Sequence, residues 1–174
     1  MEDLSKVKVD SQQGSLTYLG VEWVLLKVEA LQGMFDETYR AFGSGALTIW
    51  YLAGKGAGRA MVKLVRSLER LGSREVAERI CRELSRMGWG RFEIAEWAEE
   101  TENFVFRVYN NPFSRRGAEA PEETGCIYIK GYLEGILEEL LGRPVKLKET
   151  LCVSKGASYC EFTSKPPAET SIKA

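Results

Sequence analysis

The spacing of apolar residues changes along this chain, and this change constrains the fold more than any other feature. Apolar side chains recur at helical spacing over Val21–Phe42 and over Ala46–Leu71, and a third helix capped by its own first serine is expected at Ser73–Met87. The period then becomes two, which predicts strands around Phe92–Trp97 and over Phe104–Tyr109. A chain that switches period in this way must combine helices with a sheet.

The last third of the chain repeats the order of helix and strand. A helix is expected over Gly125–Leu141, with Gly142 as its C-terminal cap. Two strands follow, at Val145–Cys152 and Tyr159–Ser164. Helices, hairpin, helix and hairpin in this order predict the α+β class, with an antiparallel sheet.

Length and composition limit the organisation of the chain. The 174 residues suit one domain, expected over 15–165, with flexible segments at 1–14 and 166–174. No apolar run approaches the roughly 20 residues of a membrane span, and the polar start lacks the apolar core of a signal peptide, so a cytoplasmic protein is expected. The net charge of −1 provides no basic field for direct nucleic-acid binding. Abundant Glu, Lys and Arg are typical of thermophile-like surfaces, as in many archaea.

The complete absence of histidine removes much of the usual catalytic chemistry. No Ser-His-Asp triad, Cys-His pair or HExxH metal site can form. There is also no GxGxxG motif after a strand and no phosphate-binding loop. We therefore expect no enzymatic activity, and any metal must be held by thiolates and carboxylates.

Small residues are concentrated in two of the predicted helices. Ala and Gly fill most positions between Ala53 and Ala60, and Gly131 and Gly135 lie one turn apart in the later helix. Each glycine costs about 1 kcal/mol relative to alanine inside a helix. The spacing therefore predicts close approach of another backbone or of a ligand.

Three of the four cysteines gather near the end of the chain. Cys126 begins a helix, while Cys152 and Cys160 flank a turn and Glu149 precedes the turn by one strand. Three thiolates and one carboxylate could enclose a tetrahedral zinc ion, and the full set of protein ligands is typical of structural sites. The alternatives are small buried side chains, or one disulfide with a free thiol.

The motifs around these cysteines resemble those of the 4-vinyl reductase domain family of hydrocarbon-binding proteins. Cys126 is followed by Gly131-Tyr132-Leu133-Glu134-Gly135, and Lys148-Glu149-Thr150-Leu151-Cys152 precedes Tyr159-Cys160-Glu161-Phe162. The segment Val108–Pro112 resembles the strand end and turn before the cysteine helix of that family. The resemblance extends over about Leu16–Ser164.

That resemblance implies a fold shared with TRAPP tethering subunits and with the aromatic-sensing domains of bacterial regulators. A four-stranded antiparallel sheet would pack on helices, with an apolar cavity between the two layers. Structural zinc would be bound by Cys126, Glu149, Cys152 and Cys160. A homodimer would form through the N-terminal helices, here Val21–Phe42. Because the chain has no histidine, it departs from relatives that bind phenols through one.

Aromatic and aliphatic residues on the converging segments are candidates for the ligand pocket: Trp50, Phe106, Tyr132 and Leu147. For each of them, an ordinary core position is the alternative. We therefore expect a domain that binds or senses a small apolar molecule. The alternatives are a scaffold subunit of a larger assembly and, on the family name, a tetrapyrrole vinyl reductase or carrier.

Overall fold

The computed structural model describes residues 7–114 and 126–165, so the expected tail at 166–174 lies outside the described residues. The described helices are α1 (Val28–Phe42), α2 (Gly45–Leu68), α3 (Ser73–Arg86) and α4 (Ile127–Leu141), with a 3-10 turn, η1, at Val153–Lys155. The described strands are β1 (Lys8–Asp10), β2 (Ser15–Tyr18), β3 (Val21–Trp23), β4 (Arg91–Ala98), β5 (Asn103–Tyr109), β6 (Lys148–Leu151) and β7 (Cys160–Thr163).

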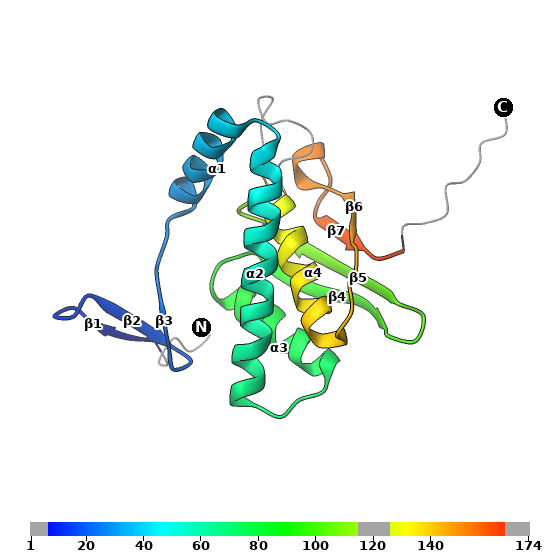
Figure 1. Ribbon diagram of the computed structural model, residues 1–174, viewed down its shortest axis with the longest axis horizontal. Coiled ribbons are helices and arrows are strands. Elements are labelled where there is room, and N and C mark those ends of the chain that lie inside the picture. Colours follow the sequence, from blue (N-terminus) through cyan, green and yellow to red (C-terminus); the bar gives the residue numbers. More distant parts are fainter. Residues whose placement is uncertain (1–6, 115–125, 166–174) are drawn as a thin grey trace.

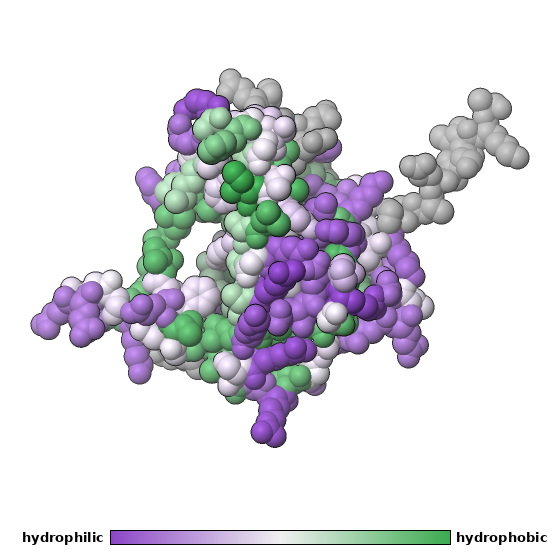
Figure 2. All heavy atoms as spheres, in the orientation of Figure 1, coloured by the Kyte–Doolittle hydropathy of each residue, from purple (hydrophilic) through white to green (hydrophobic). Residues whose placement is uncertain are grey.

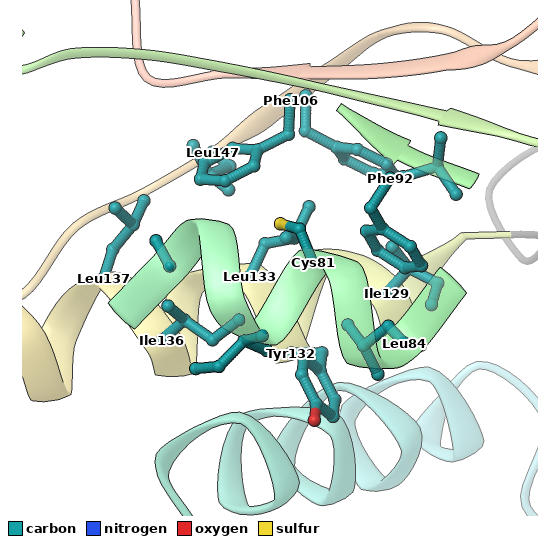
Figure 3. Close-up of a cluster of buried hydrophobic side chains, with 14 of the residues drawn as sticks. Cys81, Leu84, Phe92, Phe106, Ile129, Tyr132, Leu133, Ile136, Leu137 and Leu147 are labelled. Carbon is teal, nitrogen blue, oxygen red and sulfur yellow. The ribbon is translucent and has the colours of Figure 1, made fainter. Parts of the chain in front are cut away.

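The larger sheet has four antiparallel strands in the order β4-β5-β7-β6, which confirms the predicted α+β class (Figure 1). The two hairpins pair through their inner strands, where Phe106 of β5 lies opposite Phe162 of β7. Helices α3 and α4 lie side by side on one face of this sheet, and α2 covers them from the other side (Figure 3). The body therefore has three layers.

The space between the sheet and the middle helices is filled by packed side chains. The largest of these, all fully buried, include Phe104, Phe106 and Phe162 from the sheet and Ile129 and Leu133 from α4. Cys81 of α3 and Leu147 lie in the same cluster (Figure 3). Full burial of a large apolar side chain contributes about 1.5–3 kcal/mol, so this layer holds the sheet onto the helices.

Helices α2 and α4 pack in parallel through interlocking glycines, which explains the small residues in the sequence. A Cβ built on Gly54 would lie 3.0 Å from the carbonyl carbon of Tyr128, and one on Gly58 would lie 3.0 Å from that of Tyr132. Gly131 and Gly135 of α4 approach the backbone of α2 in the same way. The close approach is therefore between two backbones, as in the small-residue helix pairs known from other proteins.

The prediction of one helix over Val21–Phe42 is wrong at its start, because Val21–Trp23 is a strand. β2 and β3 are joined by Leu19 and Gly20, both with positive φ (53° and 78°), which is the backbone of a type I′ hairpin. With β1 they form a separate three-stranded antiparallel sheet that lies to one side of the body (Figure 1). β1 itself lies within the segment 1–14 that was expected to be flexible.

Two helix ends test the predicted caps. Gly142 has φ +69° and caps α4 as expected. The cap of α3 is Gly72 rather than Ser73, because the Gly72 N–H donates to the Glu75 carboxylate at 2.8 Å, which leaves Ser73 as the first helical residue. No described helix has the length and apolar character needed to cross a membrane.

Candidate metal centre and ligand cavity

Four potential ligands come together at the end of the larger sheet nearest the start of α4. Cys126 is the residue before α4, Glu149 lies on β6, Cys152 begins the turn after it, and Cys160 begins β7. A register shift between Glu149 and Leu151 displaces the strand locally, and Gly156, with φ +90°, closes the turn. The donor atoms of all four residues lie within 4.8 Å of one another. This cluster could therefore hold a metal ion.

The distances between sulfur atoms fit a shared ion better than a disulfide. Cys126 Sγ lies 3.6 Å from Cys152 Sγ and 3.3 Å from Cys160 Sγ, and all three cysteines are free. A disulfide requires about 2.05 Å. Tetrahedral zinc with Zn–S bonds of about 2.3 Å would place sulfurs about 3.8 Å apart. The observed separations are slightly shorter than that and far longer than a covalent bond.

The cluster is buried and rich in acidic groups. Cys160 is completely inaccessible, and burial raises the pKa of Glu149 to about 7. Hydrogen bonds from Cys126 and Cys160 hold the pKa of Cys152 far below its ordinary value, while the same bond to Cys152 raises the pKa of Cys126. Four such groups cannot all be ionised in one buried space unless a cation shares it.

Neighbouring donors orient the sulfur atoms. The side-chain amide of Asn111 donates to Cys126 Sγ at 3.3 Å and to Cys160 Sγ at 3.7 Å, and the Val153 N–H donates to Cys160 Sγ at 3.5 Å. Glu149 Oε1 is buried and has no hydrogen-bond partner among the described residues. Such a carboxylate oxygen lacks a ligand. Sequence reasoning missed Asn111, because it follows a strand in an otherwise ordinary turn.

The residues predicted to line a pocket are not gathered in one place. Phe106 and Leu147 lie in the packed layer under the sheet (Figure 3). Trp50 is half-buried on α2, where its ring contacts those of Phe35 and Tyr128 and its indole N–H donates to Thr38 at 2.7 Å. Tyr132 alone of these four lines the cavity described next.

A cavity of about 410 Å³ lies between the smaller sheet and the helices. β3 forms one wall, with Val21, Glu22 and Trp23. α2 forms the opposite wall, with Ala57, Ala60, Met61 and Leu64. The remaining lining residues are Leu84, Met87, Trp89 and Tyr132. Sequence reasoning missed the β3 wall, although Gly20 two residues after an aromatic was the available signal for a hairpin.

One buried hydrogen bond fastens the smaller sheet over this cavity. Tyr18, at the end of β2, donates its hydroxyl hydrogen to the fully buried carboxylate of Glu83 on α3. Arg79 and Arg86 form ion pairs with the same carboxylate, so its charge is compensated. The indole of Trp23 in turn donates to the Tyr18 carbonyl oxygen at 2.8 Å. The wall formed by β3 is thus fixed to the body.

Fold and site together define an α+β domain that contains an apolar cavity and a buried cluster of four potential metal ligands. Comparison with known families adds a more specific relationship. Residues 104–166 match the model of the 4-vinyl reductase domain, which confirms the predicted resemblance to that family over this segment. The match includes β5, α4, β6 and β7, and therefore every residue of the cluster.

Several known proteins share the sequence or the fold. An uncharacterized protein of Methanocaldococcus jannaschii is 29% identical over 123 residues, which is 71% of this chain and 66% of that protein, just under two thirds of its length. Among solved structures, the phenol-responsive sensory domain of the transcription activator PoxR, with phenol, has a TM-score of 0.76 at 17% identity, and the match covers 91% of this chain and 84% of that domain.

Two further structures have the same fold at lower similarity. A vinyl-4-reductase family protein from Methanocaldococcus jannaschii has a TM-score of 0.55 at 23% identity, covering 81% of this chain and 82% of its own. A trafficking protein particle complex subunit 3 from Naegleria fowleri, covalently bound to palmitic acid, has a TM-score of 0.59 at 16% identity, covering 78% of this chain and 90% of its own. These similarities support the predicted TRAPP-like fold.

Proposed function

We propose that this chain is a binding or sensing domain for a small hydrophobic molecule. The observation that carries the proposal is the cavity of about 410 Å³ with predominantly apolar walls. Its volume lies within the roughly 300–1,000 Å³ of small-molecule sites. The fold shared with a phenol-responsive sensory domain supports the same function.

We propose further that Cys126, Glu149, Cys152 and Cys160 bind structural zinc. The donor types, the separations of the sulfur atoms and the unpartnered oxygen of Glu149 all support this site. Zinc bound there would cross-link the start of α4 to the β6–β7 hairpin. The four protein donors would leave no open position for a substrate, which favours binding over a reductase activity. Metal-binding thiols also favour the cytoplasm, where cysteines stay reduced.

The N-terminal region supports the proposal of a homodimer. No residue of α1 is buried, and Val24 and Leu25 are 86% and 84% exposed in the segment that leads into it. Figure 2 shows this segment as a hydrophobic strip between the smaller sheet and α1. Contiguous exposed apolar residues mark protein interaction sites. The same strip supports the second candidate function, a scaffold subunit of a larger assembly.

Native mass spectrometry of the purified protein tests these proposals together. We expect a dimer that carries one zinc ion per chain and that gains mass when a hydrophobic ligand is added. A chain that binds zinc and a protein partner, but no small hydrophobic molecule, would favour the scaffold. Turnover of a vinyl-bearing tetrapyrrole would contradict a purely binding function.

Substitution of single cysteines tests the zinc site. We expect Cys152→Ser to lose zinc and to melt at a markedly lower temperature, because metal binding contributes to folding. Cys81→Ser is the matched control, since Cys81 is equally buried but lies outside the cluster. This control should retain one zinc ion per chain. Full zinc content and an unchanged melting temperature in Cys152→Ser would refute the site.

A further inference from the structure

We propose that the cavity under β3 selects an uncharged molecule with an apolar body and one polar oxygen, which the hydroxyl of Tyr132 recognises. The polar oxygen would belong to a hydroxyl or carbonyl group. This inference rests on the proposed function, because it assigns a chemical class to the molecule that the cavity binds. It also places recognition between α2, α3 and the smaller sheet, rather than in the packed layer under the larger sheet.

The first observation is the state of Tyr132. Only 5% of this residue is exposed, and it lines the cavity. Its side chain leaves α4 on the side away from the larger sheet and extends toward α2, with the hydroxyl at the far end (Figure 3). Its ring contacts those of Trp89 and Tyr128, but no described residue forms a hydrogen bond with its hydroxyl.

An unpartnered hydroxyl at such a position calls for a ligand. Buried polar groups in native proteins nearly always have a hydrogen-bond partner, because an unsatisfied one costs free energy. Burial raises the pKa of Tyr132, so the hydroxyl stays protonated and neutral. A neutral hydroxyl both donates and accepts a hydrogen bond. A ligand hydroxyl or carbonyl oxygen would satisfy it.

The charges around the cavity argue against an anionic ligand. Glu22 is the one charged residue among those that line the cavity, and no Lys or Arg is found among them. A carboxylate ligand would lose its hydration without gaining a cationic partner, and it would also be repelled by Glu22. The cavity is therefore suited to a neutral molecule.

The walls account for the apolar body of the ligand. Trp23 and Trp89 provide flat aromatic surface from β3 and from the turn after α3. Met61 and Met87 add flexible side chains that adapt to irregular shapes. A rigid, flat hydrocarbon with one polar group matches these walls.

The test compares three molecules that share one ring system: 2-naphthol, naphthalene and 2-naphthoate. Isothermal titration calorimetry of the wild-type protein should give the tightest binding for 2-naphthol, weaker binding for naphthalene and none for 2-naphthoate. Tyr132→Phe removes only the hydroxyl. We expect it to weaken 2-naphthol about 2- to 10-fold, the value of one neutral hydrogen bond, and to leave naphthalene unchanged. Because Tyr132 loses no hydrogen bond, the variant should melt at the wild-type temperature.

Two further variants show where the molecules bind. Ala57→Phe fills the cavity from α2 and should abolish binding of both neutral molecules. Ala53→Phe is its matched control, because Ala53 is exposed one turn earlier on α2 and lies outside the cavity lining. Glu22→Gln should allow 2-naphthoate to bind detectably while 2-naphthol keeps its affinity.

The possible results separate the two proposals. Equal affinity of wild type and Tyr132→Phe for 2-naphthol, with both neutral molecules still excluded by Ala57→Phe, would refute recognition by Tyr132 and leave the binding function intact. Tight binding of 2-naphthoate to the wild type would refute the selection against anions. Binding that survives Ala57→Phe would refute this cavity as the site. Failure of all three molecules to bind the wild type would overturn both proposals.

Discussion

Replacing Gly58 by alanine tests whether the α2–α4 contact depends on bare backbone. A Cβ at this position would overlap the carbonyl oxygen of Tyr132 and lie 3.0 Å from its carbonyl carbon, about 0.4 Å inside the 3.4 Å at which ordinary contact begins. The obstacle is backbone in the middle of a helix, which cannot rotate away. Overpacking of a core costs about 1–3 kcal/mol, and this rigid contact belongs at the upper end. Helix propensity returns about 1 kcal/mol.

The expected net loss is therefore about 2 kcal/mol of unfolding free energy, or about 4–8 °C in melting temperature for a domain of this size. Urea denaturation followed by circular dichroism measures it. Gly56→Ala is the control, because a Cβ there meets nothing within 4 Å, and it should stabilise the protein by about 0.4–1 kcal/mol. The two substitutions, two residues apart on one helix, should thus have opposite signs. Stabilisation by Gly58→Ala equal to that by Gly56→Ala would refute the interlocking of the two backbones.

Two further predictions concern hydrogen bonds and charge. Tyr18→Phe removes the hydroxyl that fastens the smaller sheet to Glu83, so limited proteolysis should cleave β1–β3 several-fold faster, while Tyr39→Phe on α1 should leave that rate unchanged; equal rates for all three proteins would contradict the fastening role. Burial alone would raise the pKa of Glu138, but hydrogen bonds from Lys55 and Arg59, each at 2.7 Å, lower that pKa below its usual value. The contribution of Glu138 to stability is therefore full above the unfolded pKa and is lost as pH falls through the lower folded pKa. The gap in denaturation midpoint between wild type and Glu138→Gln should narrow in acid, and a gap that widens would show the opposite sign.

The main architecture could be predicted because local pattern and packing agree there. The strands around Phe92–Trp97 and Phe104–Tyr109 alternate in the sequence and do form β4 and β5. The later helix was placed to within two residues, because its apolar stripe ends at Gly142, a position that requires positive φ. The cysteines and Glu149 were grouped correctly because three thiols and one carboxylate at a strand–turn–strand have few other ways to meet.

The N-terminal region could not be predicted from period alone. Val21, Val24, Leu25 and Val28 fit a helical stripe, but the type I′ turn at Leu19–Gly20 forces the chain back along β2 and makes Val21–Trp23 a strand. The position of the cavity depended on this hairpin, because β3 is one of its walls. A long-range pairing of this kind leaves only a glycine as its local signal.

The ligand cluster, the glycine contact and the cavity of this domain are connected through α4. Cys126, immediately before the helix, belongs to the ligand cluster, while Glu134, near its middle, accepts hydrogen bonds from Tyr51 and from the Leu147 N–H. Between them lies Tyr132, whose backbone N–H and carbonyl oxygen approach Gly54 and Gly58 of α2. A methyl group at Gly58 would therefore push the backbone of Tyr132 away from α2 and move its hydroxyl within the cavity. If the cavity binds its ligand through that hydroxyl, Gly58→Ala should weaken 2-naphthol more than naphthalene even at temperatures where the variant remains folded. Equal weakening of both molecules would mean that the glycine contact supports only the fold.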